Sequence, residues 1–355
     1  MERRLLFVSV NLFLLAASAT GSEIPAVFIF GDSIFDAGNN HYIPNCTVQA
    51  DFPPYGSSFF GHPTGRFTNG RTVADFISEY LGIPLQKPYM EMMNGTEKKF
   101  PANGINFASA GSGVLPATNN FSGVTAIQVQ VQQFQSLVQQ NQIDRKLLKD
   151  SFFLIQSGSN DIFSYFFPFD PPTLITPDAY VQSMLTQVGS FVDAIYSLGA
   201  RRVAVFGLGP VGCVPARSNL PGAPVGKCYG KMNKMVKIYN MGLQNLVKDL
   251  PRTHPGAIAV FGYVYETIQI YRAYPTRYGF VDVENACCGD GRLGGEVQCG
   301  KVGYKLCKNP NEYLFWDYFH PSETTYKFIS KALWAGGPTH IRPFNLKQLA
   351  NMSVT

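Results

Sequence analysis

Five short apolar runs, rich in β-branched and aromatic residues, predict the strands of a buried sheet. They cover residues 26–30, 104–108, 152–157, 202–206 and 257–263. Runs of this kind, without polar alternation, are typical of parallel strands covered on both faces. Between the runs, apolar residues recur at helical spacing over residues 71–80, 124–141, 178–198, 229–249 and 323–334. Strands that alternate with helices predict an α/β fold, with a five-stranded parallel sheet between two layers of helices.

The N-terminus departs from this pattern. Arg3 and Arg4 precede an apolar stretch from Leu5 to about Ala19, whose end offers small residues for cleavage. This is typical of a secretory signal peptide, predicted over residues 1–22, and residues 23–355 are then expected to form a single domain. The stretch is shorter than the roughly 20 apolar residues that a membrane-spanning helix needs. No later segment is long and apolar enough, so we expect no transmembrane segment.

Secretion changes the interpretation of the seven cysteines, because an oxidising compartment favours disulfides. Cys213 and Cys228 are expected to close one loop, and two bridges are expected within the set Cys287, Cys288, Cys299 and Cys307. The geometry of adjacent residues disfavours a bond between Cys287 and Cys288. Cys46 is left without an expected partner. A zinc site is the alternative for the last four, but no Cys-x-x-Cys pair occurs and the predicted signal peptide argues against it. N-glycosylation sequons, which suit a secreted protein, begin at Asn45, Asn94, Asn120 and Asn351.

Charge and composition narrow the choice of partners and cofactors. The 355 residues are 45% hydrophobic and 15% charged, and the formal net charge of +5 is modest and unclustered, so nucleic acid is not an expected partner. Residues 207–212 match Gly-x-Gly-x-x-Gly after a strand, which suggests a dinucleotide site. No Asp or Glu occurs between Asp193 and Asp249 to bind the ribose, and Pro215 interrupts the helix that would follow. We therefore expect no cofactor and interpret the segment as a loop that borders a substrate cleft.

Ser33 is the best candidate nucleophile in the chain. It follows the first apolar run directly, and the carboxyl ends of parallel strands are where open α/β sheets place their chemistry. A serine needs a base, and of the five histidines only His320 has a carboxylate, Asp317, three residues before it and a proline after it. The order Ser, Asp, His matches one known order of a catalytic triad.

Two further segments offer donors for the oxyanion that forms when a carbonyl is attacked. Gly111 lies among small residues after the second predicted strand, where its backbone N–H can approach a ligand. Asn160 follows the third strand and offers a side-chain amide at the same edge of the sheet. Taken separately, Gly111 is equally consistent with a tight turn and Asn160 with a turn cap.

Taken together and in order, these blocks resemble the GDSL esterase/lipase family, the SGNH hydrolases, and most closely its plant-type branch. The resemblance rests on Phe30-Gly31-Asp32-Ser33, on the Gly111 and Asn160 segments and on Asp317-x-x-His320-Pro321. It extends to residues 64–71, residues 209–215 and Ala286-Cys287-Cys288-Gly289, and so spans nearly the whole chain after residue 22. No Gly-x-Ser-x-Gly elbow surrounds Ser33, so a standard α/β-hydrolase is not expected.

The resemblance implies a three-layer αβα, flavodoxin-like fold in which Ser33 is the nucleophile, His320 the base and Asp317 its orienting carboxylate. It also implies an oxyanion hole made of the N–H groups of Ser33 and Gly111 and the side chain of Asn160. The expected function is that of a serine carboxylic-ester hydrolase that acts through an acyl-enzyme on a small-molecule or lipid ester. The expected destination is the apoplast, with the vacuole as the alternative.

Two alternatives to hydrolysis remain open at this stage. The same triad can transfer the acyl group to an alcohol other than water, and the chain can also be a secreted glycan- or lipid-binding protein without activity. An aromatic cluster after Asn160 is expected to be buried, but its position makes it a candidate wall for an acyl chain or an aromatic alcohol; it comprises Phe163, Tyr165, Phe166, Phe167 and Phe169. Asp32 and Asp36 suit turn capping better than the carboxylate pair of a glycosidase.

Overall fold

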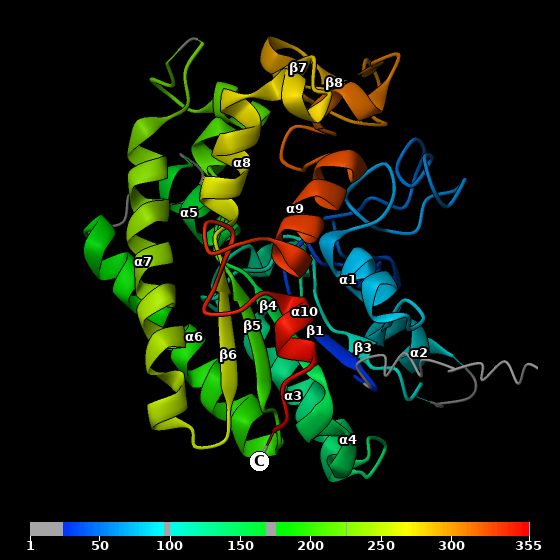
Figure 1. The fold of residues 1–355 in the computed structure, drawn as a ribbon. Helices are drawn as coiled ribbons and strands as arrows, with labels where there is room; N and C mark the ends of the chain where they lie inside the picture. The colour runs from blue at the N-terminus through cyan, green and yellow to red at the C-terminus, as the bar shows by residue number, and fades with distance from the viewer. Residues whose placement is uncertain (1–23, 96–99, 168–174, 225, 355) are drawn as a thin grey trace, which may run out of the picture.

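A central sheet organises the computed structural model, which describes residues 24–95, 100–167, 175–224 and 226–354. Within these residues the sheet has seven strands in the order β12-β6-β5-β4-β1-β3-β2. Figure 1 labels β1, β3, β4, β5 and β6 among them. The strands are β1 (Val27–Gly31), β2 (Lys87–Pro88), β3 (Ile105–Asn106), β4 (Phe152–Gln156), β5 (Arg202–Phe206), β6 (Ile258–Gly262) and β12 (Ile341–Arg342). The predicted signal peptide lies outside the described residues.

The α/β prediction is confirmed, and the number of strands is corrected. The five predicted strands correspond to β1, β3, β4, β5 and β6, which pair in parallel. β2 adds a parallel edge strand and β12 an antiparallel one. Each of these edge strands has only two residues and, unlike the equally short β3, lies outside any apolar run that could reveal it.

Helices cover both faces of the sheet. α6 (Pro177–Leu198) and α7 (Gly230–Thr253) lie on one side, and α1 (Val73–Leu81) and α9 (Glu323–Ala335) on the other (Figure 1). The other α-helices are α2 (Tyr89–Asn94), α3 (Ile127–Gln139), α4 (Arg145–Asp150), α5 (Ser159–Phe166), α8 (Val264–Ala273) and α10 (Leu346–Ala350). Among the helices that the structure describes, we find no candidate for a membrane-spanning segment.

Short elements fill the connections. The described residues also form two small sheets, a three-stranded one of β8 to β10 and a pair of β7 and β11. Their bounds are β7 (Asp282–Ala286), β8 (Cys288–Asp290), β9 (Val297–Gln298), β10 (Lys305–Leu306) and β11 (Tyr313–Phe315). β7 and β8 lie at the top of the view in Figure 1, above the main sheet. The 3₁₀ turns are η1 (Asn39–Tyr42), η2 (Asn120–Ser122), η3 (Val211–Cys213), η4 (Pro215–Asn219), η5 (Pro275–Tyr278), η6 (Arg292–Gly294) and η7 (Pro310–Glu312).

Strand β1 ends at a residue that has to be glycine. Gly31 has φ +146°, and a Cβ there would lie 2.0 Å from the carbonyl oxygen of Gln156 on β4. Its N–H donates to Oε1 of the buried Gln130 on α3 (2.9 Å), and its carbonyl accepts from Nε2 of the same side chain (2.9 Å). Because the chain turns sharply under these restraints, the next two residues leave the sheet at a defined point.

The turn after β1 contains two buried carboxyl groups, and both cap backbone N–H groups as the sequence suggested. Asp36 accepts from the backbone of Gly38, Asn39 and Ala110 at 2.7–2.8 Å. Asp32 accepts only from the N–H of Ile34 (3.1 Å), and its Oδ2 has no partner among the described residues. Burial raises the pKa of Asp32 to about 7 and that of Asp36 to about 6.

Asp32 makes the stability of the fold depend on pH. An unfolded aspartate titrates near pH 4. Between about pH 4 and pH 7 the folded chain therefore retains a proton that the unfolded chain has lost, and the free energy of unfolding falls as the pH rises. Asp32→Asn removes this proton uptake, so the variant should lose less stability across this window, by a few kcal/mol relative to the unsubstituted chain. Urea unfolding at several pH values measures the difference.

The exposed Asp249 supplies the control, since Asp249→Asn should leave the pH dependence as it is. If Asp32→Asn and the unsubstituted chain lost stability in parallel between pH 4 and pH 7, Asp32 would be ionised in the folded protein and this account would be wrong.

Candidate active site

The predicted site residues meet at the carboxyl edge of the sheet. Ser33 follows β1, Gly111 follows β3, and Asn160 lies in the first turn of α5, directly after β4. Asp317 and His320 arrive from the other end of the chain, in the loop between β11 and α9. This loop lies over the edge because β11 pairs with β7 and α9 packs against α1.

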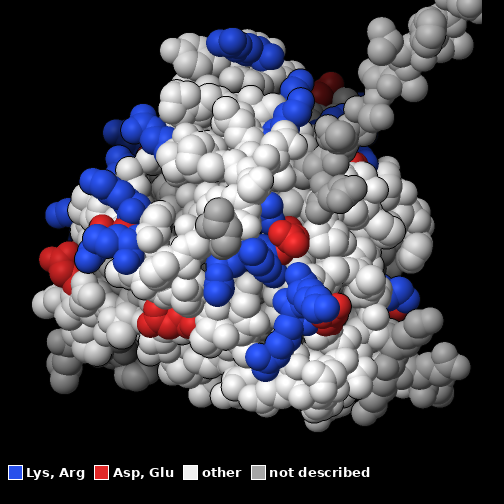
Figure 2. Space-filling view, turned by 60° about the horizontal axis from the view of Figure 1, so that its bottom comes forward, with Lys and Arg blue, Asp and Glu red and all other residues white. Residues whose placement is uncertain are grey.

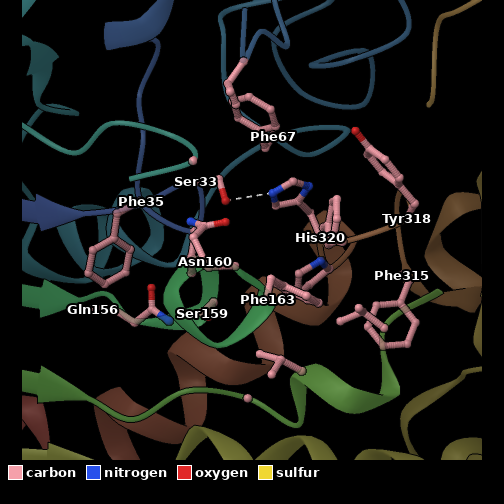
Figure 3. A pocket seen from close by; sticks show the side chains of 18 of the residues that line it. Ser33, Phe35, Phe67, Gln156, Ser159, Asn160, Phe163, Phe315, Tyr318 and His320 are labelled. Carbon is pink, nitrogen blue, oxygen red and sulfur yellow. Dashed lines mark hydrogen bonds between the residues drawn. The ribbon is translucent and has the colours of Figure 1, made fainter. Parts of the chain in front are cut away.

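Ser33, His320 and Asp317 form a continuous line of hydrogen bonds. The Oγ of Ser33 lies 2.8 Å from Nε2 of His320 (Figure 3), and Nδ1 of His320 lies 2.8 Å and 2.9 Å from the two carboxylate oxygens of Asp317. Asp317 is fully buried, and the other two residues are less than a tenth exposed. The geometry leaves one imidazole nitrogen for the carboxylate and the other for the hydroxyl, as transfer of the serine proton requires.

Asp317 is held by three further donors. Its Oδ1 accepts from the backbone N–H of Phe319 (2.9 Å) and His320 (2.8 Å), which closes a tight turn around the carboxylate. Its Oδ2 accepts from the hydroxyl of Tyr55 at 2.7 Å. Tyr55 is fully buried, and burial together with the negative charge of Asp317 raises the pKa of its hydroxyl well above the usual range, so the phenol remains a donor. The sequence contained no signal for Tyr55, which lies 262 residues from Asp317.

The backbone of two disulfide-bonded cysteines supports the loop that carries Asp317 and His320. The N–H groups of Cys287 and Cys288 donate to the carbonyls of Phe315 (3.0 Å) and Trp316 (2.7 Å), and the N–H of Trp316 donates to the carbonyl of His320 (2.8 Å). The structure joins Cys287 to Cys307 and Cys288 to Cys299, which is one of the two non-vicinal arrangements that the sequence left open.

A third disulfide and a free cysteine complete the set. Cys213 is joined to Cys228, as expected, and closes the loop that follows β5. The N–H of Ala216 in this loop donates to the carbonyl of Tyr318 (2.7 Å), three residues after Phe315. Cys46 remains unpaired and buried.

The two oxyanion candidates lie at the same pocket as Ser33. The side chain of Asn160 lies beside the Ser33 hydroxyl (Figure 3), and one of its amide hydrogens is donated to the carbonyl of Ser112 at 2.9 Å. An NH₂ group has two hydrogens, so this bond fixes the amide and leaves the other hydrogen for a ligand. Gly111 has φ +80°, and its carbonyl is held by the side chain of Asn119 (2.8 Å).

The pocket around Ser33 has a volume of about 750 Å³ and walls that are mostly apolar. It is lined by the aromatic residues Phe35, Phe67, Phe163, Phe167, Phe206, Phe315, Tyr318 and Phe319 and by aliphatic side chains of α8 and α9. The ring of Phe67 lies 5.0 Å from the imidazole of His320. Such a pocket suits a largely apolar ligand whose polar, reactive group lies at the serine.

Part of the aromatic cluster and the glycine-rich segment after β5 both border this pocket. Phe163 and Phe167 line it, and Gly209, Pro210 and Val211 border it, as suggested for the glycine-rich segment after β5. Tyr165 and Phe166 pack against the core instead, and Phe169 lies outside the described residues. The expected wall is therefore formed by fewer residues of the aromatic cluster than the sequence suggested.

The face drawn in Figure 2 carries charged side chains of both signs, and Lys and Arg are interspersed with Asp and Glu. In the ranges that the structure covers, no group of three or more His, Cys, Asp or Glu side chains could hold a metal ion.

Comparison with known proteins shows the family to which the chain belongs. Residues 27–333 match the family described as GDSL-like Lipase/Acylhydrolase. The chain is 63% identical to GDSL esterase/lipase 6 of Arabidopsis thaliana over 340 residues, which cover 95% of this chain and 93% of that protein. It is 36% identical to GDSL esterase/lipase 7 of the same plant (92% of each chain) and 34% identical to the GDSL lipase of Tanacetum cinerariifolium (93% and 89%). The chain therefore belongs to the GDSL-like lipase/acylhydrolase family.

Proposed function

We propose that the protein is a serine carboxylic-ester hydrolase that acts through an acyl-enzyme on Ser33. The observation that carries the proposal is the unbroken line of hydrogen bonds from Ser33 through His320 to Asp317, set in an apolar pocket. We further propose that residues 23–355 form one catalytic domain and that the enzyme requires no metal or organic cofactor.

Each residue has a defined task in the proposed reaction. The Oγ of Ser33 attacks the ester carbonyl while Nε2 of His320 takes its proton, and Asp317 stabilises the resulting imidazolium. The N–H groups of Ser33 and Gly111 and the free amide hydrogen of Asn160 donate to the oxyanion. The intermediate then collapses, the alcohol leaves with the proton from His320, and water repeats the sequence to release the acid.

Loss of the serine hydroxyl should abolish the reaction. We expect hydrolysis of p-nitrophenyl acetate, butyrate and palmitate by the purified chain, and a fall in kcat of at least about a thousandfold in Ser33→Ala. Ser164→Ala is the matched control, since this serine lines the same pocket without contacting His320, and it should retain activity. An organophosphonate probe should label the unsubstituted chain but not Ser33→Ala.

The result also separates the alternatives. Labelling without hydrolysis, followed by ester formation when an alcohol is added, would indicate an acyltransferase. A folded chain that neither reacts with the probe nor hydrolyses any ester would contradict the proposal and favour a binding function.

We propose Tyr55 as a positioning residue that acts through Asp317. Tyr55→Phe retains the ring contacts with Phe52, Phe67 and Trp316 but removes a charge-assisted hydrogen bond. Without this donor the carboxylate attracts the protonated imidazole more strongly and is less firmly oriented. We expect kcat to fall about tenfold with little change in KM, and the acidic limb of the pH–rate profile to move to higher pH.

The pH profile distinguishes positioning from a structural role. Phe52→Leu alters a neighbouring ring without touching Asp317 and should leave the acidic limb in place. A Tyr55→Phe profile that coincides with that of the unsubstituted chain would show that the hydroxyl does not act through the triad.

We also propose that the protein is secreted and glycosylated, with the apoplast as its destination and the vacuole as the alternative. Three disulfides suit an oxidising compartment, and all four sequon asparagines (Asn45, Asn94, Asn120 and Asn351) are exposed. Expression in plant cells should yield a chain that begins near residue 23 and shifts in mass on treatment with a glycosidase. A chain that retains residues 1–22 would contradict secretion by a cleaved signal peptide.

A further inference from the structure

The pocket has two regions that differ in exposure. One, which we call the mouth, is formed by Thr47, Val48, Asn119 and Phe121, and Phe121 is 81% exposed. The other, which we call the inner arm, is walled by Phe35, Phe206, Val264, Ile268, Ile329 and Leu333. Phe35, Phe206, Ile329 and Leu333 are at most 3% exposed. Ser33 and His320 line the same pocket as both regions.

The inner arm lies between the sheet and two helices. On α8, Val264 and Ile268 are four residues apart, and on α9, Tyr326, Ile329 and Leu333 are spaced by three and four, so each set shares one helix face. A Cβ at Gly209 would lie 2.9 Å from Ile268, and one at Gly262 would lie 2.6 Å from Leu333. The absence of side chains at these glycines keeps the space between the helices and the sheet open.

Two polar side chains interrupt the apolar wall of the inner arm. Gln156, the last residue of β4, is 4% exposed, and Tyr326 is 1% exposed. Within the described residues, neither Oε1 of Gln156 nor the hydroxyl of Tyr326 has a hydrogen-bond partner, although both residues line the pocket. A buried polar atom without a partner is unfavourable, so a ligand or a water molecule is expected at each.

The order of the reaction assigns the inner arm to the acyl group. In an acyl-enzyme the alcohol has to leave before water can attack, and the exposed mouth gives it a way out, whereas the acyl chain stays attached to Ser33. An acyl chain in the inner arm is surrounded by buried apolar side chains and meets the amide of Gln156 and the hydroxyl of Tyr326. A hydroxyl group can donate to the first and accept from the second.

We propose that the inner arm binds an acyl chain that carries a hydroxyl group, with Gln156 and Tyr326 as the residues that recognise this hydroxyl. Gln156 pairs with Gly31, which lies two residues before Ser33, so the recognised hydroxyl lies in the half of the chain nearer the ester. This inference rests on the proposed ester hydrolysis and narrows its substrate to esters of hydroxylated fatty acids.

The test compares ethyl decanoate with ethyl decanoates that carry one hydroxyl at successive carbons, using the purified full chain and measuring release of the acid. The kcat/KM for the best hydroxylated ester should exceed that for ethyl decanoate by at least about tenfold, because the plain chain leaves two buried polar atoms unpaired. Tyr326→Phe and Gln156→Met, which keep the shape of each side chain, should each reduce this ratio several-fold.

The ratio of the two kcat/KM values is taken within each variant, so that partial loss of folded protein cancels. Tyr274→Phe and Gln139→Met change exposed residues and should keep the ratio of the unsubstituted chain. A ratio that survived both Tyr326→Phe and Gln156→Met would place the hydroxyl elsewhere and overturn the assignment.

Hydrolysis of p-nitrophenyl acetate by the unsubstituted chain shows whether the inference alone fails or the proposed function fails with it. If acetate and ethyl decanoate were hydrolysed but no hydroxylated ester were preferred, the two polar groups would bind buried water only, and the inference would fail while the proposed function stood. If no ester at all were hydrolysed, the proposed function would fail as well.

Discussion

The geometry of the site depends on the close approach of two backbones at Gly31. No side chain fits between this residue and the carbonyl of Gln156, and the carbonyl of Gly31 accepts from the N–H of Ser109 and the hydroxyl of Ser112 as well as from Gln130. These bonds tie β1 to the loop after β3 and to α3. Because Ser33 is only two residues further on, its position is determined by the sheet and not by a mobile loop.

The histidine side of the site is secured by independent means. Its loop is anchored to disulfide-linked backbone at Cys287 and Cys288, and Tyr55 reaches Asp317 from a different part of the chain. Both halves of the proposed triad are thus held by buried contacts before any substrate arrives, which is the preorganisation that electrostatic catalysis requires. The same turn contains an unfavourable feature, because Asp32 is a buried carboxyl whose Oδ2 lacks a hydrogen-bond partner within the described chain and whose pKa is raised by burial.

The pocket relates this rigid centre to the choice of substrate. Its walls are apolar near the sheet and helices, which favours a hydrocarbon chain, but Gln156 and Tyr326 bring polar atoms into the same space. Gln156 belongs to the strand that packs against Gly31, and Tyr326 to the helix that follows His320. The residues proposed to recognise the acyl group are therefore built into the elements that position the nucleophile and the base.

The sequence by itself determined the elements whose signal is local. Apolar runs revealed the strands β1, β3, β4, β5 and β6, and helical periodicity revealed α1, α3, α6, α7 and α9. Residue types in order made Ser33, Asp317 and His320 the candidates for a catalytic triad. The edge strands β2 and β12 and the short helices α2, α4 and α10 were missed, because a few residues carry no readable period. The helices α5 and α8 were also missed, although α8, with 10 residues, is longer than α1, with 9. Only the tertiary structure decided that Tyr55 contacts Asp317 and that Gln156 and Tyr326 share a cavity. Such contacts join residues far apart in the chain, and they arise from the order of strands in the sheet and the packing of loops at its edge, which no local pattern encodes.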